Sequence, residues 1–265
     1  MRARFVIAAA TVVLAACTTG PSGTFTVNGH DLHLECNGGP GPTVVFEAAV
    51  GGDHSLWPIA DLIREQALAC VYDRAGNGDS SVPEERMTAE TDVADLHDLM
   101  AEANVPRPVV IVGHSYGTLV AWIEAVEHPD DVVGLVLIDG TPPSGSDLLE
   151  SVLTDDERDQ FHDAFVDLPN VDFLASLDQA ERYYALSPDM PVTFITATNS
   201  MQPWCEIGLP CDKMQGAAIA LADEFASDHA AARYVKTATS HYVHDDDPDL
   251  VVSEILRVLD LIESP

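Results

Sequence analysis

Residues 108–127 read PVVIVGHSYGTLVAWIEAVE and combine three features in a fixed order. Pro108 to Val112 is an apolar run, typical of a strand that is buried on both faces of a sheet. Gly113-His114-Ser115-Tyr116-Gly117 follows at once, and the residues from Tyr116 to Glu127 have helical spacing. A serine on so sharp a strand-to-helix turn needs small residues two positions before it and two positions after it. At such a turn the backbones of the strand and the helix come too close to leave room for larger side chains. The stretch therefore predicts a buried strand, a serine hydroxyl held on a tight turn, and a helix whose first N–H groups favour negative charge at that serine.

Short apolar runs separated by helical stretches recur on both sides of this segment. This alternation predicts an α/β fold with a mostly parallel, doubly wound sheet, opened by a hairpin around Asn28-Gly29. The predicted strands are Phe25–Val27, Leu32–Cys36, Val44–Phe46, Cys70–Tyr72, Val109–Val112, Val133–Ile138 and Val192–Ile195. The predicted helices are Leu56–Gln66, Thr88–Ala103, Tyr116–Glu127 and Leu250–Ile262.

The segment from Thr141 to Met190 interrupts the alternation. It is acidic, has helix-like stretches at Asp147–Val166 and Val171–Leu186, and contains no convincing strand. We expect a small helical cap over the carboxyl edge of the sheet, at about residues 141–190. The chain of 265 residues is long enough for one large core, so residues 24–265 are predicted to form a single catalytic domain that includes this cap.

The amino terminus has the pattern of an export signal. Arg2 and Arg4 precede an apolar run from Phe5 to Ala16 that is too short to span a bilayer comfortably. Leu14-Ala15-Ala16-Cys17 resembles the lipobox of bacterial lipoproteins, in which the cysteine is acylated. The alternative is ordinary cleavage after a small residue. We therefore expect a signal peptide at 1–17 with lipidation at Cys17, a short tether at 18–23, and an exported cell-envelope lipoprotein or a secreted protein.

The net charge of −32 excludes some partners. The chain has only two lysines, so its surface repels nucleic acid and anionic membranes. We expect no nucleic-acid partner and membrane contact only through the lipid anchor. A monomer acting on a small molecule is the simplest expectation.

Export places the cysteines in an oxidising compartment. Without Cys17 an even number remains, namely Cys36, Cys70, Cys205 and Cys211, which allow three connectivities. Cys205 and Cys211 bracket a short loop and can pair locally, which leaves Cys36 for Cys70. A metal site is disfavoured for these cysteines because no histidine stands near either pair at zinc-ligand spacing.

Four further segments complete a resemblance to the α/β-hydrolase superfamily, which covers nearly the whole chain after the signal peptide. TVVFEAAVGGDHSLW (Thr43 to Trp57) resembles the third strand and oxyanion loop of that family, and VYDRAGNGDS (Val71 to Ser80) its fourth strand and turn. VVGLVLIDG, ending at Gly140, resembles the sixth strand, and SHYVHDDDPDLV from Ser240 the segment that carries the histidine. The family fold also implies that Cys36 and Cys70 meet on antiparallel strands.

The resemblance implies a catalytic triad of Ser115, Asp139 and His241. A serine hydroxyl needs a base to take its proton, and the resemblance favours His241 over His244, three residues later, whereas His114 is expected to pack against the sheet. The usual acid follows the seventh strand, where this chain reads Thr196-Ala197-Thr198-Asn199-Ser200 without a carboxylate. Asp139, after the sixth strand, is its replacement in some members of the family. The alternatives are that Asp139 only caps a turn, or that Asp212 or Asp223 is the acid.

Two backbone N–H groups are expected to stabilise the oxyanion. Tyr116, just after the serine, supplies one, and Val50 in the loop after the third strand supplies the other. The family often has His-Gly where this chain has Ala48-Ala49, which leaves the second donor uncertain by one residue. The turn Asp73 to Ser80 is expected to be structural, with Asp73 and Arg74 tying loops together.

The function these residues imply is hydrolysis of a carboxylic ester through an acyl-enzyme on Ser115. An amide, a thioester or acyl transfer to an alcohol would use the same groups. No metal or organic cofactor is implied. The alternative of another class is a non-catalytic binding lipoprotein of the same fold, favoured by the missing acid after the seventh strand. Aromatic and aliphatic residues predict an apolar pocket under the cap, namely Phe161, Phe165, Phe173, Leu174, Tyr183 and Tyr184.

Overall fold

The computed structural model describes residues 18–263 other than 53, 141–145, 167, 169, 185, 187 and 230. The expected signal peptide and Cys17 lie outside the described residues, as does the start of the segment predicted to form a cap. Within the described ranges, no helix is both long enough and apolar enough to cross a membrane.

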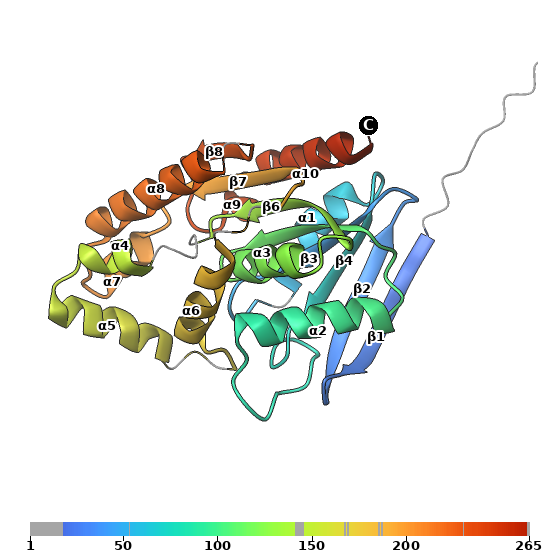
Figure 1. The fold of residues 1–265 in the computed structure, drawn as a ribbon, viewed down its shortest axis with the longest axis horizontal. Coiled ribbons are helices and arrows are strands. Elements are labelled where there is room, and N and C mark those ends of the chain that lie inside the picture. The colour runs from blue at the N-terminus through green and yellow to red at the C-terminus, as the bar shows by residue number, and fades with distance from the viewer. Residues whose placement is uncertain are drawn as a thin grey trace, which may run out of the picture.

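The core is one eight-stranded sheet in the order β1-β2-β4-β3-β5-β6-β7-β8 (Figure 1). β2 is antiparallel to β1 and β4, and the other neighbours are parallel, which confirms the predicted mostly parallel sheet. After β3 the chain moves to β4 on one side and then returns to β5 on the other. Ligands bind beyond the carboxyl ends of strands at such a reversal. The strands are β1 Thr18–Val27, β2 His30–Gly38, β3 Thr43–Glu47, β4 Leu68–Asp73, β5 Val109–His114, β6 Val132–Ile138, β7 Val192–Ala197 and β8 Arg233–Thr237.

Helices cover both faces of this sheet. Alternate residues of the buried strands point to opposite faces, and they pack with α2 and α3 on one side and with α1 and α10 on the other. The helices α4, α5 and α7 lie at one end of the molecule, opposite the hairpin of β1 and β2 (Figure 1). The helical segments are η1 His54–Leu56, α1 Trp57–Ile63, α2 Ala89–Glu102, α3 Gly117–Glu127, α4 Ser146–Ser151, α5 Asp155–Val166, α6 Phe173–Tyr184, α7 Gln202–Glu206, α8 Cys211–Asp228, α9 Val243–Asp246 and α10 Pro248–Glu263.

Two segments differ from the sequence expectation. Residues 18–23, expected as a tether, belong to β1, where the backbone of β2 supplies the pairing that their small polar side chains do not reveal. The helix α8 was not predicted, although its buried residues Met214, Ala217, Leu221 and Phe225 recur at helical spacing. The helical spacing is hard to recognise in the sequence because Gly208 and Pro210 stand just before the helix and exposed acidic residues lie within it.

Both expected disulfides are present. Cys36 and Cys70 are register partners on the antiparallel strands β2 and β4, with their Cα atoms 4.0 Å apart. Cys205 and Cys211 join α7 to the start of α8. The first bond ties the hairpin to the sheet. The second closes the short loop between α7 and α8, and each of these helices lines one of two cavities described below.

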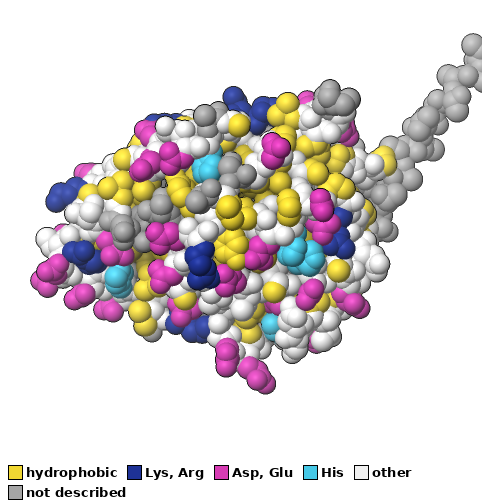
Figure 2. Space-filling view, viewed as in Figure 1, with side chains coloured by type: hydrophobic (Ala, Val, Ile, Leu, Met, Phe, Trp, Pro, Cys, Tyr) yellow, Lys and Arg dark blue, Asp and Glu magenta, His cyan; other side chains and the backbone are white. Residues whose placement is uncertain are grey.

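Acidic side chains are spread over the visible face of the molecule and are not gathered in one patch (Figure 2). This distribution fits the net charge of −32.

Candidate active site

Ser115 sits on a strained turn between β5 and α3. Its φ is 54°, in the left-handed region that a residue with a side chain adopts only when its surroundings impose it. A Cβ on Gly113 would press against the backbone of Gly117 and Thr118, and a Cβ on Gly117 would overlap the carbonyl oxygen of Glu47. The two glycines are therefore required by the turn and by the close approach of the loop after β3.

Asp139 and His241 meet at the carboxyl edge of the sheet. Asp139 follows β6, and its Oδ2 lies 2.7 Å from Nδ1 of His241, which stands in the loop between β8 and α9. Oδ1 of Asp139 accepts the backbone N–H of Ala197, at 2.8 Å. Both carboxylate oxygens are thus engaged, and Asp139 is only 9 % exposed.

Ser115 lies on the same cavities as His241. A small hollow of about 60 Å³ is lined by Ser115, Asp139 and His241 together. A larger cavity of about 340 Å³ is also lined by Ser115 and His241. Because Asp139 holds Nδ1, Nε2 is the ring nitrogen of His241 that remains available to another partner.

Two further histidines, His114 and His244, are buried near His241. His114 is 1 % exposed and donates from Nε2 to the backbone oxygen of His241, at 2.9 Å. Burial, with His241 and His244 nearby, holds the pKa of His114 well below its ordinary value. His244 is also buried, and its ring packs edge-on against His114. The ring of His244 therefore packs in the interior, and His114 anchors the loop that carries His241, a contact the sequence did not predict.

The alternative acids lie elsewhere. Asp212 is exposed in the first turn of α8, and Asp223 pairs with Lys236 at 2.6 Å. Neither residue lines the two cavities that contain Ser115.

Arg74 fixes the loop that carries Val50, the expected oxyanion donor. Its guanidinium donates to the backbone oxygens of Ala48, at 2.6 Å, and Ala49, and it pairs with the fully buried Glu47. Val50 comes next in the chain and lines the 340 Å³ cavity with Ser115. Arg74 therefore holds a loop in place, as expected. The loop that it holds is the one after β3, which carries Val50 and lies beside Ser115.

Tyr116, the other expected donor, is anchored by its side chain. Its hydroxyl donates to Oδ2 of Asp92 on α2, at 2.6 Å, and its ring lies under Arg74. Burial raises the pKa of Asp92 to about 7, against the opposing effect of Arg74. One buried polar network therefore supports both segments that would supply oxyanion N–H groups.

The 340 Å³ cavity has the character of a substrate pocket. Its walls come largely from α5, α6 and α7, and most of the side chains are apolar. Of the predicted lining residues, Phe161, Phe165, Phe173 and Leu174 are present. Tyr183 instead donates to Glu127, and Tyr184 packs near Phe225. Residues that line this wall but were not predicted for it include Leu149, Leu177, Met201, Trp204 and Tyr242.

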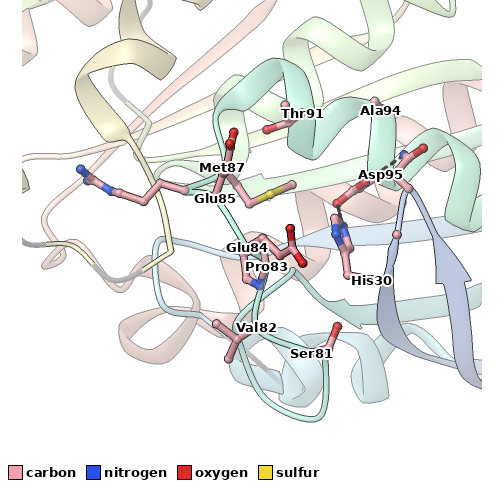
Figure 3. Close-up of a pocket in the computed structure, with 13 residues that line it drawn as sticks. His30, Ser81, Val82, Pro83, Glu84, Glu85, Met87, Thr91, Ala94 and Asp95 are labelled. Atoms are coloured by element: carbon pink, nitrogen blue, oxygen red, sulfur yellow. Dashed lines mark hydrogen bonds and ion pairs between the residues drawn. The ribbon is translucent and has the colours of Figure 1, made fainter.

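A cavity of about 690 Å³ lies elsewhere, between the β1–β2 hairpin, residues 81–87 and α2. Figure 3 shows His30 and Asp95, two of its lining residues, pointing toward one another in direct contact. Asn28 also donates to Asp95, at 2.9 Å, so this carboxylate is already satisfied. None of Ser115, Asp139 and His241 lines this cavity. The 340 Å³ cavity beside Ser115, which is smaller and more apolar than this one, is therefore the candidate active site.

Comparisons with solved structures show the same fold. The enol-lactonase from Burkholderia xenovorans LB400 aligns over 90 % of this chain and 100 % of its own, with a TM-score of 0.62 and 20 % sequence identity. A curated protein from Bacillus subtilis (strain 168), the uncharacterized protein YqjL, is 26 % identical over 232 residues, which cover 86 % of this chain and 88 % of YqjL.

A second curated relative is similar over a shorter stretch. The putative carbamate hydrolase RutD of Escherichia coli O1:K1 / APEC is 33 % identical over 103 residues, 37 % of this chain and 38 % of RutD. The sequence model of the alpha/beta hydrolase family matches residues 37–254, which supports an enzyme of that kind. With the match spanning most of the chain, the protein belongs to the alpha/beta hydrolase family.

Proposed function

We propose that the protein is a serine hydrolase that cleaves a carboxylic ester through an acyl-enzyme on Ser115. The observation that carries the proposal is the His241 ring, held by Asp139 at 2.7 Å on a cavity that Ser115 also lines. A buried carboxylate on Nδ1 keeps the proton on that nitrogen, so Nε2 is free to accept the serine proton.

The reaction would run in two halves. Ser115 Oγ attacks the ester carbonyl carbon while His241 Nε2 takes its proton, and the oxyanion receives the N–H groups of Tyr116 and Val50. His241 then donates that proton to the departing alcohol. In the second half His241 takes a proton from a water molecule, whose oxygen attacks the acyl carbon. The bond from that carbon to Ser115 Oγ then breaks, His241 returns the proton to Oγ, and the acid leaves.

The pocket favours an ester with an apolar acyl or alcohol group. The aromatic rings of Phe161, Phe165 and Trp204 pack against one another along its wall, with centroids 4.9–5.5 Å apart. The names of an enol-lactonase and a putative carbamate hydrolase among similar proteins agree with cleavage at a carbonyl carbon. Transfer of the acyl group to an alcohol would use the same groups, and product analysis in the presence of alcohol separates the two reactions.

The non-catalytic alternative loses its main support in the structure. It rested on the absence of an acid after β7, yet Asp139 reaches His241 from the end of β6. Labelling with a fluorophosphonate probe provides the direct test. We expect the wild type to be labelled and Ser115→Ala not to be, and an unlabelled but folded wild type would contradict the proposal.

Substrate preference is tested with p-nitrophenyl esters of increasing acyl length. We expect kcat/KM to rise with chain length until the 340 Å³ cavity is filled. The variant Phe173→Ala removes a ring from the wall and so enlarges the cavity. It is expected to move the optimal acyl length to longer chains. An optimum at acetate that Phe173→Ala does not move would show that the cavity does not hold the acyl chain.

We further propose that the chain is exported, anchored through lipidated Cys17 and monomeric. The support for export and anchoring is the sequence pattern at the amino terminus, and a monomer is the simplest state for action on a small molecule. Blocking lipoprotein processing is expected to change its gel migration, and Cys17→Ser to release it from the membrane fraction. Unchanged behaviour in both experiments would remove the anchor.

A further inference from the structure

Three polar side chains converge between α2 and α3, away from the candidate active site. His97 comes from α2, Glu124 from the last turns of α3, and His128 from the residue that caps α3. The His97 and His128 rings stack with centroids 3.7 Å apart. One ligand atom from each of the three residues can be chosen so that all lie within 4.8 Å of one another.

The carboxylate of Glu124 is the unusual member of this group. Its side chain is fully buried, and its Oε2 has no hydrogen-bond partner. The nearest cationic candidate, Nε2 of His128, is 3.7 Å away, which is too long for a hydrogen bond. A buried carboxylate oxygen without a donor is costly, and buried charges normally have a paired or metal partner.

The spacing of the group suits a small divalent ion. Two ligands about 2.1 Å from a tetrahedral zinc ion stand roughly 3.4 Å apart. Here His97 Nδ1 is 3.1 Å from Oε1 of Glu124, and His128 Nε2 is 3.7 Å from Oε2. Two imidazole nitrogens and one carboxylate form a donor set that zinc accepts.

Access and a fourth ligand are also available. The side chains of His97 and His128 are 25 % and 32 % exposed, so an ion can reach them from solvent. Asp131 lies 4.0 Å from Nδ1 of His97 and is held by Arg107 at 2.7 Å. A water molecule or Asp131 would complete four-coordination.

We propose that His97, Glu124 and His128 form a zinc site that clamps α2 to α3. The ion would bind Nδ1 of His97, Nε2 of His128 and the Glu124 carboxylate. α3 begins two residues after Ser115 and the site is at its far end, so a helix of 11 residues, about 16 Å long, separates the ion from the nucleophile. The ion is therefore structural, and hydrolysis does not depend on it.

The test uses the full chain without a histidine tag, stripped with EDTA and titrated with ZnCl₂ by calorimetry. We expect one zinc ion per chain. At free zinc 100-fold above Kd we expect a rise in Tm of about 5 to 10 °C. Co²⁺ is expected to bind the same site and to show the visible absorption of a tetrahedral complex.

Single variants locate the ion. His97→Ala and His128→Ala are each expected to weaken zinc binding at least tenfold and, at the same free zinc concentration, to reduce the rise in Tm by about half or more. His33→Ala is the matched control, because His33 is also a partly exposed histidine beside a carboxylate, Glu35 at 3.5 Å, but is not part of the cluster. Far-ultraviolet circular dichroism and fluorophosphonate labelling report whether each variant is folded.

Two results would overturn the proposal. One is the absence of saturable zinc binding by the folded wild type. The other is binding by His97→Ala and His128→Ala as tight as that of the wild type, which would put the ion elsewhere. Neither result bears on the ester hydrolysis proposed for Ser115, which is measured separately by probe labelling.

Discussion

Replacing Asp139 with asparagine tests the proposed triad with little change of shape. Oδ1 of Asp139 accepts the N–H of Ala197, and Oδ2 faces Nδ1 of His241. Asparagine has only one acceptor oxygen, and the Ala197 N–H requires it. The amide NH₂ must then face His241, so Nδ1 becomes an acceptor and the ring proton moves to Nε2. A protonated Nε2 can no longer accept the proton of Ser115.

The expected loss in kcat is about 10⁴-fold, equivalent to about 5.4 kcal/mol of barrier. It is measured with a p-nitrophenyl ester and with the rate of fluorophosphonate labelling, while Tm should change little because the substitution is isosteric. Asp223→Asn is the matched control, since Asp223 is exposed and pairs with Lys236. A folded Asp139→Asn protein that keeps more than a tenth of wild-type kcat would refute the role of Asp139.

Three further perturbations address the supporting structure. Gly117→Ala is expected to cost about 1 to 3 kcal/mol in unfolding free energy, because its Cβ would overlap the Glu47 carbonyl, whereas Gly216→Ala on α8 meets open space and should not lower Tm. Arg74→Lys retains a charge beside Glu47 but cannot hold two carbonyl oxygens in the same fork, so kcat should fall about tenfold to a hundredfold with KM nearly unchanged; a parallel rise in KM with constant kcat would contradict the positioning role. The pKa of Asp92 is raised from 3.8 to about 7 in the folded protein, so folding favours its protonated form and the stability it contributes is lost as the pH rises from about 4 to 7. The difference in Tm between wild type and Asp92→Asn should therefore change over that range in favour of Asp92→Asn, and a difference independent of pH would contradict it.

The sheet and the serine turn could be predicted because their causes are local. Apolar runs mark strands covered on both faces, and Gly113 and Gly117 are required by contacts within a few residues and with one neighbouring loop. Asp139 was predictable only through the family resemblance. The structure adds the physical reason that the end of β7 supplies an N–H group, from Ala197, to orient the carboxylate that comes from β6.

Other features depend on packing between distant segments. Arg74 reaches carbonyl oxygens about 25 residues earlier in the chain, and His114 holds the backbone of His241 from 127 residues away. No periodic pattern in the sequence encodes such a pairing. The meeting of His97 with Glu124 likewise requires the relative rotation of two helices, which hydrophobic spacing predicts only to within a turn.

The site residues and the cavity wall come from different parts of the fold, which bears on how the substrate preference of such a protein could change. Ser115, Asp139 and His241 are carried by the ends of β5 and β6 and the loop after β8, whereas α5, α6 and α7 supply much of the cavity wall. Exchanging those helices for the corresponding ones of a homologue would therefore change the wall of the proposed substrate cavity and leave Ser115, Asp139 and His241 in place. The fold thus separates the residues proposed to react from the helices proposed to select the substrate.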